Sequence, residues 1–467
     1  MMLKRTCAIV FLLGILGLLA ACGAGSGTSL SSSSTTTTTG TDANLTITDA
    51  PPAGVAVVSF EVTINNVTLQ PGDVPLINKP QRVELTSLQA HTAFLDSKKV
   101  PPGTYTGMTV TYASPSLTIT NNTGAAIGTC AINATCELHP PVGTGQFSFT
   151  SAPFPITVGQ GSPFGLLVAF DLKNTIQNDL SLAPVITVKQ VTSAAGHGPD
   201  QDIDDVTGKV TAKDTTANTI TIQSGGSDGK TTTITVDANT VYKHFDDAQL
   251  TNTFASVAVG QALKADLKLQ AGGVLLAKVI ELRGATTEQH GQLAGMITSV
   301  DSATQFKMVV RDETPDITSA DHGTVVTVTL SNPKPFTKDD LNLTIPQGVQ
   351  FSTSADLMVG QLVLVKPTAS MTAAAITTSD VRLLTSSITA RVSAINGANI
   401  TVDTLPAIFT SANPSVTSMT VSTSNLTAFE NVSGVSGLAV GDQISFDGLL
   451  FKASPPVVAA RKVRKRN

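Results

Sequence analysis

Apolar and polar side chains alternate with a period of two along most of the chain after residue 43, and the alternation breaks at Gly, Pro, Asn and Asp. This period places successive side chains on opposite faces of a β-strand, and the interrupting residues are typical of tight turns. The clearest strands are expected at Val55–Ile64, Tyr105–Tyr112, Phe164–Phe170 and Val185–Val191. Because no helical stripe extends over three turns in this part of the chain, the sequence predicts an all-β protein that begins with a β-sandwich-like domain.

A loose repeat occupies the second half of the chain. Each copy has the order strand, strand, Val-Gly turn, strand, strand, and the turns are Val259-Gly260, Val359-Gly360 and Val440-Gly441. Units of this length can each close into a small barrel. We therefore expect a sandwich-like domain followed by about three small β-barrel-like domains, at residues 43–193, 206–284, 289–385 and 386–463.

The first residues have the organisation of a secretory signal. Lys4 and Arg5 are followed by an apolar run from Cys7 to Leu19, which is shorter than the roughly 20 residues that a membrane span needs. The run ends in Leu19-Ala20-Ala21-Cys22, which resembles the lipobox of bacterial lipoproteins. The resemblance implies that residues 1–21 are a signal peptide and that the Cys22 thiol receives a diacylglyceryl group. An ordinary signal peptide with a cysteine there by chance is the alternative.

Residues 22–42 are rich in Ser and Thr and show no apolar periodicity. We expect a disordered, lipidated tether that holds the first domain clear of the headgroups. Two or more acyl chains give stable attachment, so the expected anchor is permanent. Gly23 is not the aspartate that commonly retains lipoproteins in the inner membrane, which favours the outer membrane, with the domains on its periplasmic or surface face.

Composition narrows the range of partners. Charged residues make up 13% of the chain, about half the usual share, and there is no Trp and little Tyr. The scarcity of aromatic rings argues against a base-stacking surface and against an aromatic platform for sugars. The net charge of −5 gives no general attraction to nucleic acid, so no nucleic-acid partner is expected.

Two cysteines remain once Cys7 is removed with the signal and Cys22 is lipidated. In an exported protein we expect Cys130 and Cys136 to form a disulfide that closes a small loop between strands and stabilises the fold by about 2 kcal/mol. A metal-binding or redox pair is the alternative. The spacing is not that of a CxxC motif, and no histidine lies at ligand spacing.

Catalytic and metal-binding motifs are missing from the sequence, including HExxH, GxSxG and phosphate-binding loops. The histidines are dispersed, at His91, His139, His197, His244, His290 and His322. The adjacent carboxylates Asp246-Asp247 and Asp339-Asp340 would point to opposite faces of a strand, which makes them poor partners for acid–base catalysis. We therefore expect no catalytic residue, metal or cofactor.

Short motifs give the first domain and the repeats a resemblance to known families. In the first domain these are Thr46–Pro51, Val83–Leu88, Val100–Tyr105, Val168–Leu172 and Leu182–Ile186. Their order resembles the bacterial domain of unknown function 4382, which occurs in secreted and lipid-anchored proteins and has no established activity. The first repeat resembles the domain of unknown function 5666, a small barrel-like module, and the later two look like divergent copies. The resemblance implies architecture and compartment but no mechanism.

Asp49 and Asp171 are two carboxylates of the first-domain motifs to which a chemical role could be given. Asp49 precedes Ala50-Pro51 and can bond its own backbone in a turn. Asp171 ends a strand, where a carboxylate usually accepts hydrogen bonds from nearby backbone donors. The structural interpretation is favoured for both.

Residues 194–205 are rich in Gly, His and Asp and are expected to form an interdomain linker. Three of its aspartates have the alternate spacing of a calcium loop, namely Asp200, Asp202 and Asp204. Position six is Asp205 rather than glycine, and position twelve is Thr211 rather than glutamate, so a solvated acidic linker is the better interpretation.

The residues 461–466 form a strongly basic cluster at the C-terminus. It could contact anionic lipid or lipopolysaccharide, at about 1 kcal/mol per residue near such a surface. A solvated tail is an equally good interpretation.

Together these observations favour a membrane-anchored lipoprotein of the cell envelope that acts as a non-catalytic binding or structural module. Repeated β-domains on a tether suit the presentation of loops or edge strands to another envelope protein or to a polysaccharide. The alternative is an envelope enzyme, such as a hydrolase, with a site on the first β-domain. The absence of clustered His, acids and aromatics counts against it.

Overall fold

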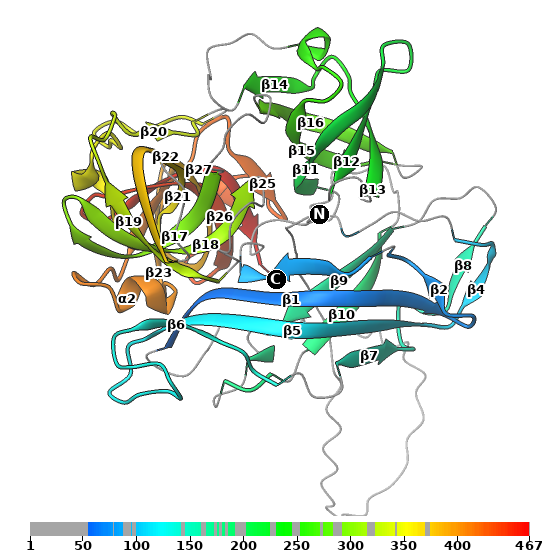
Figure 1. Ribbon diagram of the computed structural model, residues 1–467, viewed down its shortest axis with the longest axis horizontal. Helices are drawn as coiled ribbons and strands as arrows, with labels where there is room; N and C mark the ends of the chain where they lie inside the picture. The colour runs from blue at the N-terminus through cyan, green and yellow to red at the C-terminus, as the bar shows by residue number, and fades with distance from the viewer. Residues whose placement is uncertain are drawn as a thin grey trace, which may run out of the picture.

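The computed structural model describes most of the chain from residue 55 to residue 466. The described segments are 55–77, 79–86, 95, 100–141, 145–159, 165–171, 175–176, 180–182, 185–191, 202–224, 230–244, 253–270, 274–283, 292–314, 323–340, 343–368 and 374–466. Nearly all of their regular structure is β (Figure 1). The expected all-β class is thus confirmed.

The first domain is built on two long antiparallel strands, β1 (Val55–Gln70) and β5 (Gly107–Asn121), which pair along their whole length. Shorter strands extend this sheet on either side. Those beside β1 are β2 (Val74–Pro75) and β3 (Gln81–Glu84), and those beside β5 are β6 (Thr135–Leu138) and β7 (Gln146–Phe149). Most side chains of β1 and β5 are buried, and the apolar ones on one face of the sheet, such as Phe60, Ile64 and Tyr112, are covered by a second layer.

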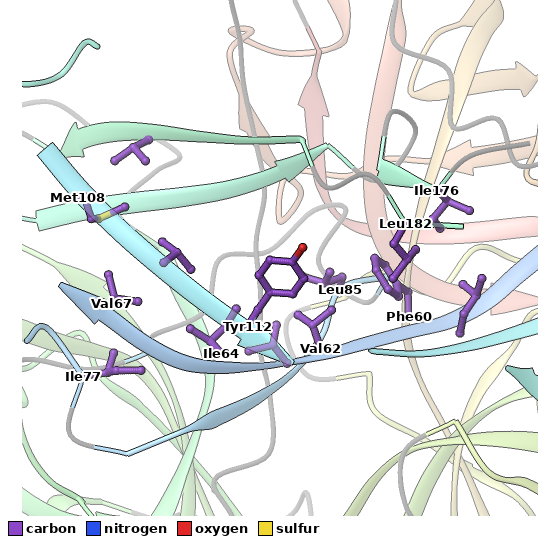
Figure 2. Packing of buried hydrophobic residues seen from close by; sticks show 14 of the residues in the cluster. Phe60, Val62, Ile64, Val67, Ile77, Leu85, Met108, Tyr112, Ile176 and Leu182 are labelled. Carbon is purple, nitrogen blue, oxygen red and sulfur yellow. The ribbon is translucent and has the colours of Figure 1, made fainter. Parts of the chain in front are cut away.

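The second layer of the first domain consists of smaller pieces. They are the antiparallel pair β9 (Gly165–Asp171) and β10 (Val185–Val191), and the pair β4 (Gly103–Tyr105) and β8 (Ile156–Val158). Phe60, Ile64 and Tyr112 of the large sheet face Leu182 and Ile176 across the core (Figure 2). The large sheet and this layer of two smaller sheets enclose one apolar core, which makes a sandwich-like domain, as expected.

The first barrel follows. Its strands are β11 (Asp202–Asp214), β12 (Thr219–Ser224), β13 (Lys230–Thr235), β14 (Val241–His244), β15 (Ala262–Leu269) and β16 (Leu275–Arg283). The sheet runs β13-β12-β11-β15-β16 and closes because β13 also pairs with β16 in parallel. This five-stranded Greek-key arrangement is the architecture of the OB fold. β11 begins at Asp202, so it includes the last residues of the segment expected to be a linker.

The second and third barrels have the same strand order. The second contains β17 (Gln292–Ser302), β18 (Gln305–Thr314), β19 (Val325–Leu330), β20 (Thr337–Lys338), β21 (Leu362–Pro367) and the first part of β22 (Ala375–Asn396). The third contains the rest of β22 with β23 (Asn399–Asp403), α2 (Ala407–Thr410), β24 (Met419–Ser422), β25 (Ala428–Glu430), β26 (Gln443–Phe451) and β27 (Val457–Lys465). In each, the third and last strands pair in parallel and close the barrel.

The Val-Gly turn has one structure in all three barrels. Its glycine has a positive φ, of 92° in Gly260, 89° in Gly360 and 97° in Gly441, which glycine adopts without steric cost. The glycine N–H donates to a carbonyl of the first strand, on Val210, Ile297 and Val392 respectively. The next side chain, Gln261, Gln361 or Asp442, accepts a backbone N–H from the start of the turn. The repeat seen in the sequence is therefore a conserved local geometry of the barrel.

The second and third barrels are continuous with each other. β22 is the last strand of one and the first strand of the other, so the boundary expected between 385 and 386 falls inside a strand. Leu449, Phe451 and Ala459 of the third barrel belong to the apolar core of the second. The two barrels are one fused body, whereas the apolar cluster of the first barrel contains only its own residues.

Candidate functional site at the domain junctions

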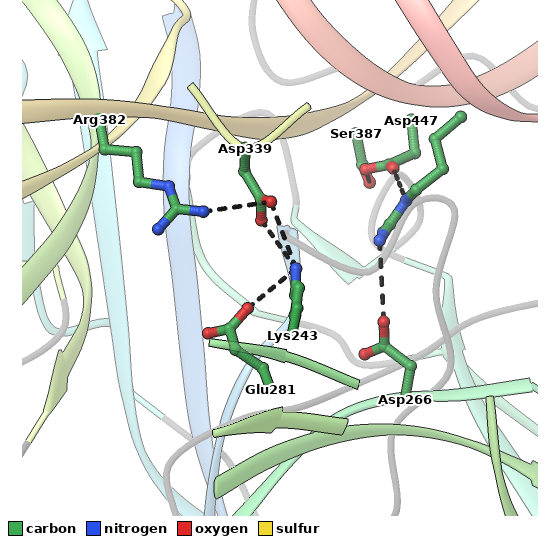
Figure 3. Close-up of polar contacts among 8 residues, drawn as sticks. Lys243, Asp266, Glu281, Asp339, Arg382, Ser387 and Asp447 are labelled. Carbon is green, nitrogen blue, oxygen red and sulfur yellow. Dashed lines mark hydrogen bonds and ion pairs between the residues drawn. The ribbon is translucent and has the colours of Figure 1, made fainter. Parts of the chain in front are cut away.

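The densest group of described charged side chains lies between the first and second barrels. Lys243 of β14 places its Nζ 2.9 Å from Glu281 Oε2 and 3.2 Å from Asp339 Oδ2. The other carboxylate oxygen of Asp339, Oδ1, lies 3.4 Å from Nη2 of Arg382 (Figure 3). These side chains are largely buried, with Glu281 only 4% exposed. We call Lys243, Glu281, Asp339 and Arg382 the junction cluster.

Strand geometry brings the junction cluster together. β14 pairs in parallel with β16, and in that register Lys243 lies opposite Glu281. Asp339 follows β20, which pairs in parallel with β22 beside Arg382. β14 and β20 are equivalent strands of two barrels, and each carries one member of the ion pair that crosses the junction. Asp340, in contrast, pairs with Lys338, so the adjacent carboxylates have different partners.

The electrostatics of the junction cluster favour fixed charges. Burial by itself raises the pKa of the Asp339 carboxyl, but Lys243, Arg382 and Lys264 together lower it by more, so this pKa lies below its ordinary value. A carboxylate held ionised in this way is a weak base at neutral pH. The arrangement of opposite charges can hold the two barrels together.

A second ion pair joins the first barrel to the third. Arg461 donates from its Nε to Asp447 at 2.8 Å, and its Nη1 lies 3.8 Å from Asp266 of the first barrel. Ser387 donates a hydrogen bond to the same Asp447 carboxylate. Figure 3 shows Asp266, Ser387 and Asp447 in line beside the junction cluster. Ion pairs therefore connect the first barrel to both of the other barrels.

The junction between the first domain and the second barrel is different in kind. Val309 of β18 packs in one apolar cluster with Ala56 and Val58 of β1. Arg311, on the same strand, donates from Nη2 to the Val58 carbonyl. Burial lowers the pKa of the Arg311 guanidinium, and the negative charge of Glu84 partly offsets this. In OB folds the surface of the second and third strands binds ligands, and here that surface of the second barrel is covered by the first domain.

Glu84 lies in the motif Val83–Leu88 that the sequence singled out, and it is almost fully buried. Its carboxylate accepts hydrogen bonds from the Phe60 N–H at 2.9 Å and from the Thr86 hydroxyl at 2.7 Å. Ser59 donates to the same oxygen. This part of the motif therefore ties β3 to β1 and places a negative charge near Arg311. Sequence reasoning recognised the motif but assigned Glu84 no role, because two of its partners, Ser59 and Phe60, are more than twenty residues away.

Some residues predicted from the sequence can be placed. Cys130 and Cys136 form a disulfide with Cα atoms 5.6 Å apart. Asp171 is the last residue of β9. Asp202 and Asp204 lie in β11.

Other sequence predictions fall outside the described residues. These are the signal peptide 1–21, the tether 22–42 with the lipidation site Cys22, Asp49, Asp200, the pair Asp246-Asp247, and the histidines His91, His197, His290 and His322. Within the described segments, no group of three or more His, Cys, Asp or Glu side chains could hold a metal ion. Among these same residues, no helix is both long and apolar enough to span a bilayer.

The basic C-terminus is not a solvated tail, and that interpretation was wrong. The residues form β27, the last strand of the third barrel. Lys462 and Arg464 pair with Glu430 at 3.3 and 2.6 Å, and Lys465 pairs with Asp442 at 2.7 Å. Each of these three charges has an acidic partner within the barrel.

Comparison with known proteins identifies families for three of the four domains. Residues 40–184 match the domain of unknown function DUF4382, and residues 207–281 and 389–461 match the domain of unknown function DUF5666. No protein with a curated description matches the chain. A solved Drosophila structure described as Unr CSD456 is similar at 10% identity, over 56% of this chain and 97% of that one, with a TM-score of 0.12.

The second barrel lies between the two DUF5666 matches. It shares their strand order and their Val-Gly turn, although the family model does not match it. The chain thus contains a DUF4382 domain followed by two DUF5666 domains.

Proposed function

We propose that this protein is a membrane-anchored lipoprotein of the cell envelope that acts as a non-catalytic binding or structural module. The observation that carries the proposal is the segment Leu19-Ala20-Ala21-Cys22 at the end of a short apolar run with basic residues before it. The Cys130–Cys136 disulfide supports it, because disulfides persist in oxidising compartments outside the cytoplasm. Gly23 favours the outer membrane.

The domain arrangement supports a role in presenting surfaces. The ion pairs of the junction cluster and of Arg461 join the first barrel to the other two barrels. On the first barrel, the surface of β12 and β13 carries Thr221, Thr231 and Thr233, and the last two are exposed. Surfaces of this kind, together with loops and strand edges, suit a protein or polysaccharide partner of the envelope better than nucleic acid.

The proposal is tested by metabolic labelling with a clickable palmitate analogue, followed by membrane fractionation. The wild type and a Cys7→Ala variant should both carry label and sediment with membranes, because Cys7 lies in the cleaved segment. A Cys22→Ala variant should lose label and membrane attachment together. An unlabelled wild-type protein in the soluble fraction would contradict the anchor.

A further inference from the structure

The Val-Gly turns of the three barrels differ in what covers them. In the first and third barrels the turn valine is open. Val259 is 64% exposed and Val440 is 67% exposed, the highest values among the large apolar side chains of the described residues. At the same place in the second barrel, Val359 is only partly exposed and packs on an apolar cluster. We call residues 258–260 and 439–441 the open turns.

The covered turn of the second barrel shows what its occupant looks like. The occupant is the short helix α2 of the third barrel, whose Phe409 ring lies so close over Gly360 that a β-carbon on this glycine would overlap the ring. Met358 and Val359 of the turn pack on the apolar cluster that contains Ile408 and Phe409. Aromatic side chains are enriched in this way at the centres of protein interfaces. In the second barrel the turn is therefore a contact site for an apolar helix.

The open turns have the same backbone without the ring. The φ angles of Gly260 and Gly441 are 92° and 97°, close to the 89° of Gly360. A β-carbon on Gly441 would meet no described atom within 4 Å. On Gly260 it would meet only the flexible side chain of Lys209, whose Cε would be 3.9 Å away, an ordinary contact distance. Both open turns thus leave room for a ring in the position that Phe409 takes over the second barrel.

The surroundings of the open turns are uncharged as well. Each follows a 3-10 helix, η3 (Phe254–Ser256) in the first barrel and η6 (Val435–Gly437) in the third. No charged residue occurs in residues 253–263 or 431–441, and the alanine before each turn valine is exposed. Single exposed apolar residues are common on protein surfaces. Here, however, one Ala-Val-Gly sequence is exposed at the same place in both barrels that match DUF5666, and the covered turn lies in the barrel that does not.

We propose that the open turns are docking sites for a partner protein that places an aromatic side chain, carried on a short apolar helix, over Gly260 and Gly441. The inference rests on the proposed binding role and names its partner class, but it does not depend on the lipid anchor. The α2 helix of a second copy is already packed in its own chain, so the occupant is a different protein. One turn offers a small contact area, and a partner that engages both turns gains avidity.

The test uses the helix that covers the second barrel as the probe. A peptide of residues 404–416 contains α2, and a hydrocarbon staple holds it helical, which circular dichroism verifies. Phe409→Trp in the peptide supplies the ring and the fluorophore. Because the protein contains no Trp, all tryptophan emission comes from the peptide. The protein is the chain from residue 23 onward, which needs no detergent that would compete for apolar sites.

We expect the peptide emission to shift to shorter wavelength and its anisotropy to rise when the protein is added. Val259→Asp and Val440→Asp should each remove about half of this change, and the double variant nearly all of it, because separate sites contribute additively and a carboxylate is costly to bury beside a ring. Val274→Asp is the matched control, since Val274 is 39% exposed on the first barrel but lies outside the turn. It should bind the peptide like the wild type.

A second peptide separates the ring from the rest of the helix. It carries Phe409→Ala together with Ala412→Trp for detection, and it should not bind. Equal binding of the two peptides, no binding of the first, or binding that persists in the double variant would each overturn the inference. The palmitate labelling tests the anchor separately, so a failure here leaves that result unchanged.

Discussion

The second barrel meets its two barrel neighbours in opposite ways. Towards the third barrel it shares a continuous strand and an apolar core, and the Gln361 amide donates to the Leu450 carbonyl at 3.0 Å. It contacts the first barrel through the ion pair between its Asp339 and Lys243 of that barrel. Both partners have the same fold. From this difference we expect that one small barrel can be joined permanently or separably, according to which of its surfaces carries apolar residues.

The two kinds of junction respond to different conditions. Apolar burial does not depend on protonation, whereas an ion pair is lost when its carboxylate is protonated. Because the junction cluster is largely buried, salt screens it much less than it screens an exposed pair. Partly buried pairs also contribute little net stability, because the charges lose hydration when they are brought together. We therefore expect the first barrel to separate from the fused pair under conditions that leave the fused pair intact.

The largest effect should come from Phe409→Ala. Phe409 is 2% exposed and packs with residues of the second and third barrels and the first domain. Removing its ring should lower the free energy of unfolding of the fused pair by about 3–5 kcal/mol. Denaturant titration measures this. The control is Phe254→Ala in the first barrel, where the ring is only partly buried, and a loss as large there would break the comparison.

A smaller effect separates two equivalent glycines. Gly360→Ala and Gly441→Ala place a methyl group at almost the same positive φ, but only at Gly360 would it overlap the Phe409 ring. In both variants the free energy of unfolding should fall by about 1 kcal/mol, because alanine is strained in the left-handed conformation. In Gly360→Ala it should fall by roughly a further 1–3 kcal/mol, because the new methyl group overpacks the Phe409 ring. Thermal unfolding of both variants decides this, and equal losses would mean that Phe409 moves aside freely.

Lys243→Met should change the global stability little but separate the first barrel. The variant leaves Glu281 and Asp339 without this cation, so the junction loses its closest ion pair and keeps the longer Arg461–Asp266 pair. Small-angle scattering should show a larger radius of gyration at the same salt concentration. Lys338→Met is the control, because the exposed Lys338–Asp340 pair is worth at most about 1 kcal/mol and lies within one barrel. An unchanged radius for Lys243→Met would show that contacts other than this pair hold the junction.

The smallest effect concerns pH. The pKa of Asp339 is lowered in the folded protein. The stabilisation that its carboxylate gives the junction is therefore complete above the ordinary aspartate pKa of about 3.9, and it is lost as the pH falls through the lower pKa of the folded state. The radius of gyration should therefore rise only below about pH 4. In Asp339→Asn it should already be larger at neutral pH and change less on acidification. A transition of the same size in that variant would assign the pH response to other carboxylates.

Local patterns in the sequence were enough to predict much of the fold. The period-two alternation gave the strands, and the repeated Val-Gly turn predicted three related units, because the turn needs a glycine at Gly260, Gly360 and Gly441. The pairing of Cys130 with Cys136 followed from export and from the lack of other free cysteines. These features depend on neighbouring residues, which is why a single sequence reveals them.

The junctions were not predictable in the same way. Lys243 and Asp339 are far apart in the chain, and only the closure of two barrels brings them together. The continuity of β22 was missed because alternation on both sides of residue 385 is the same whether the strand ends there or continues. The basic C-terminus was misjudged because Glu430 and Asp442, which neutralise it, lie on other elements.

The shared strand β22 has a consequence for how the molecule unfolds. Each of the fused barrels closes only through its part of β22, so loss of that strand from one barrel removes structure from the other. We expect the second and third barrels to melt in a single cooperative transition, and the first barrel to melt in a separate one. Three domains that look alike in sequence would then give two thermodynamic units.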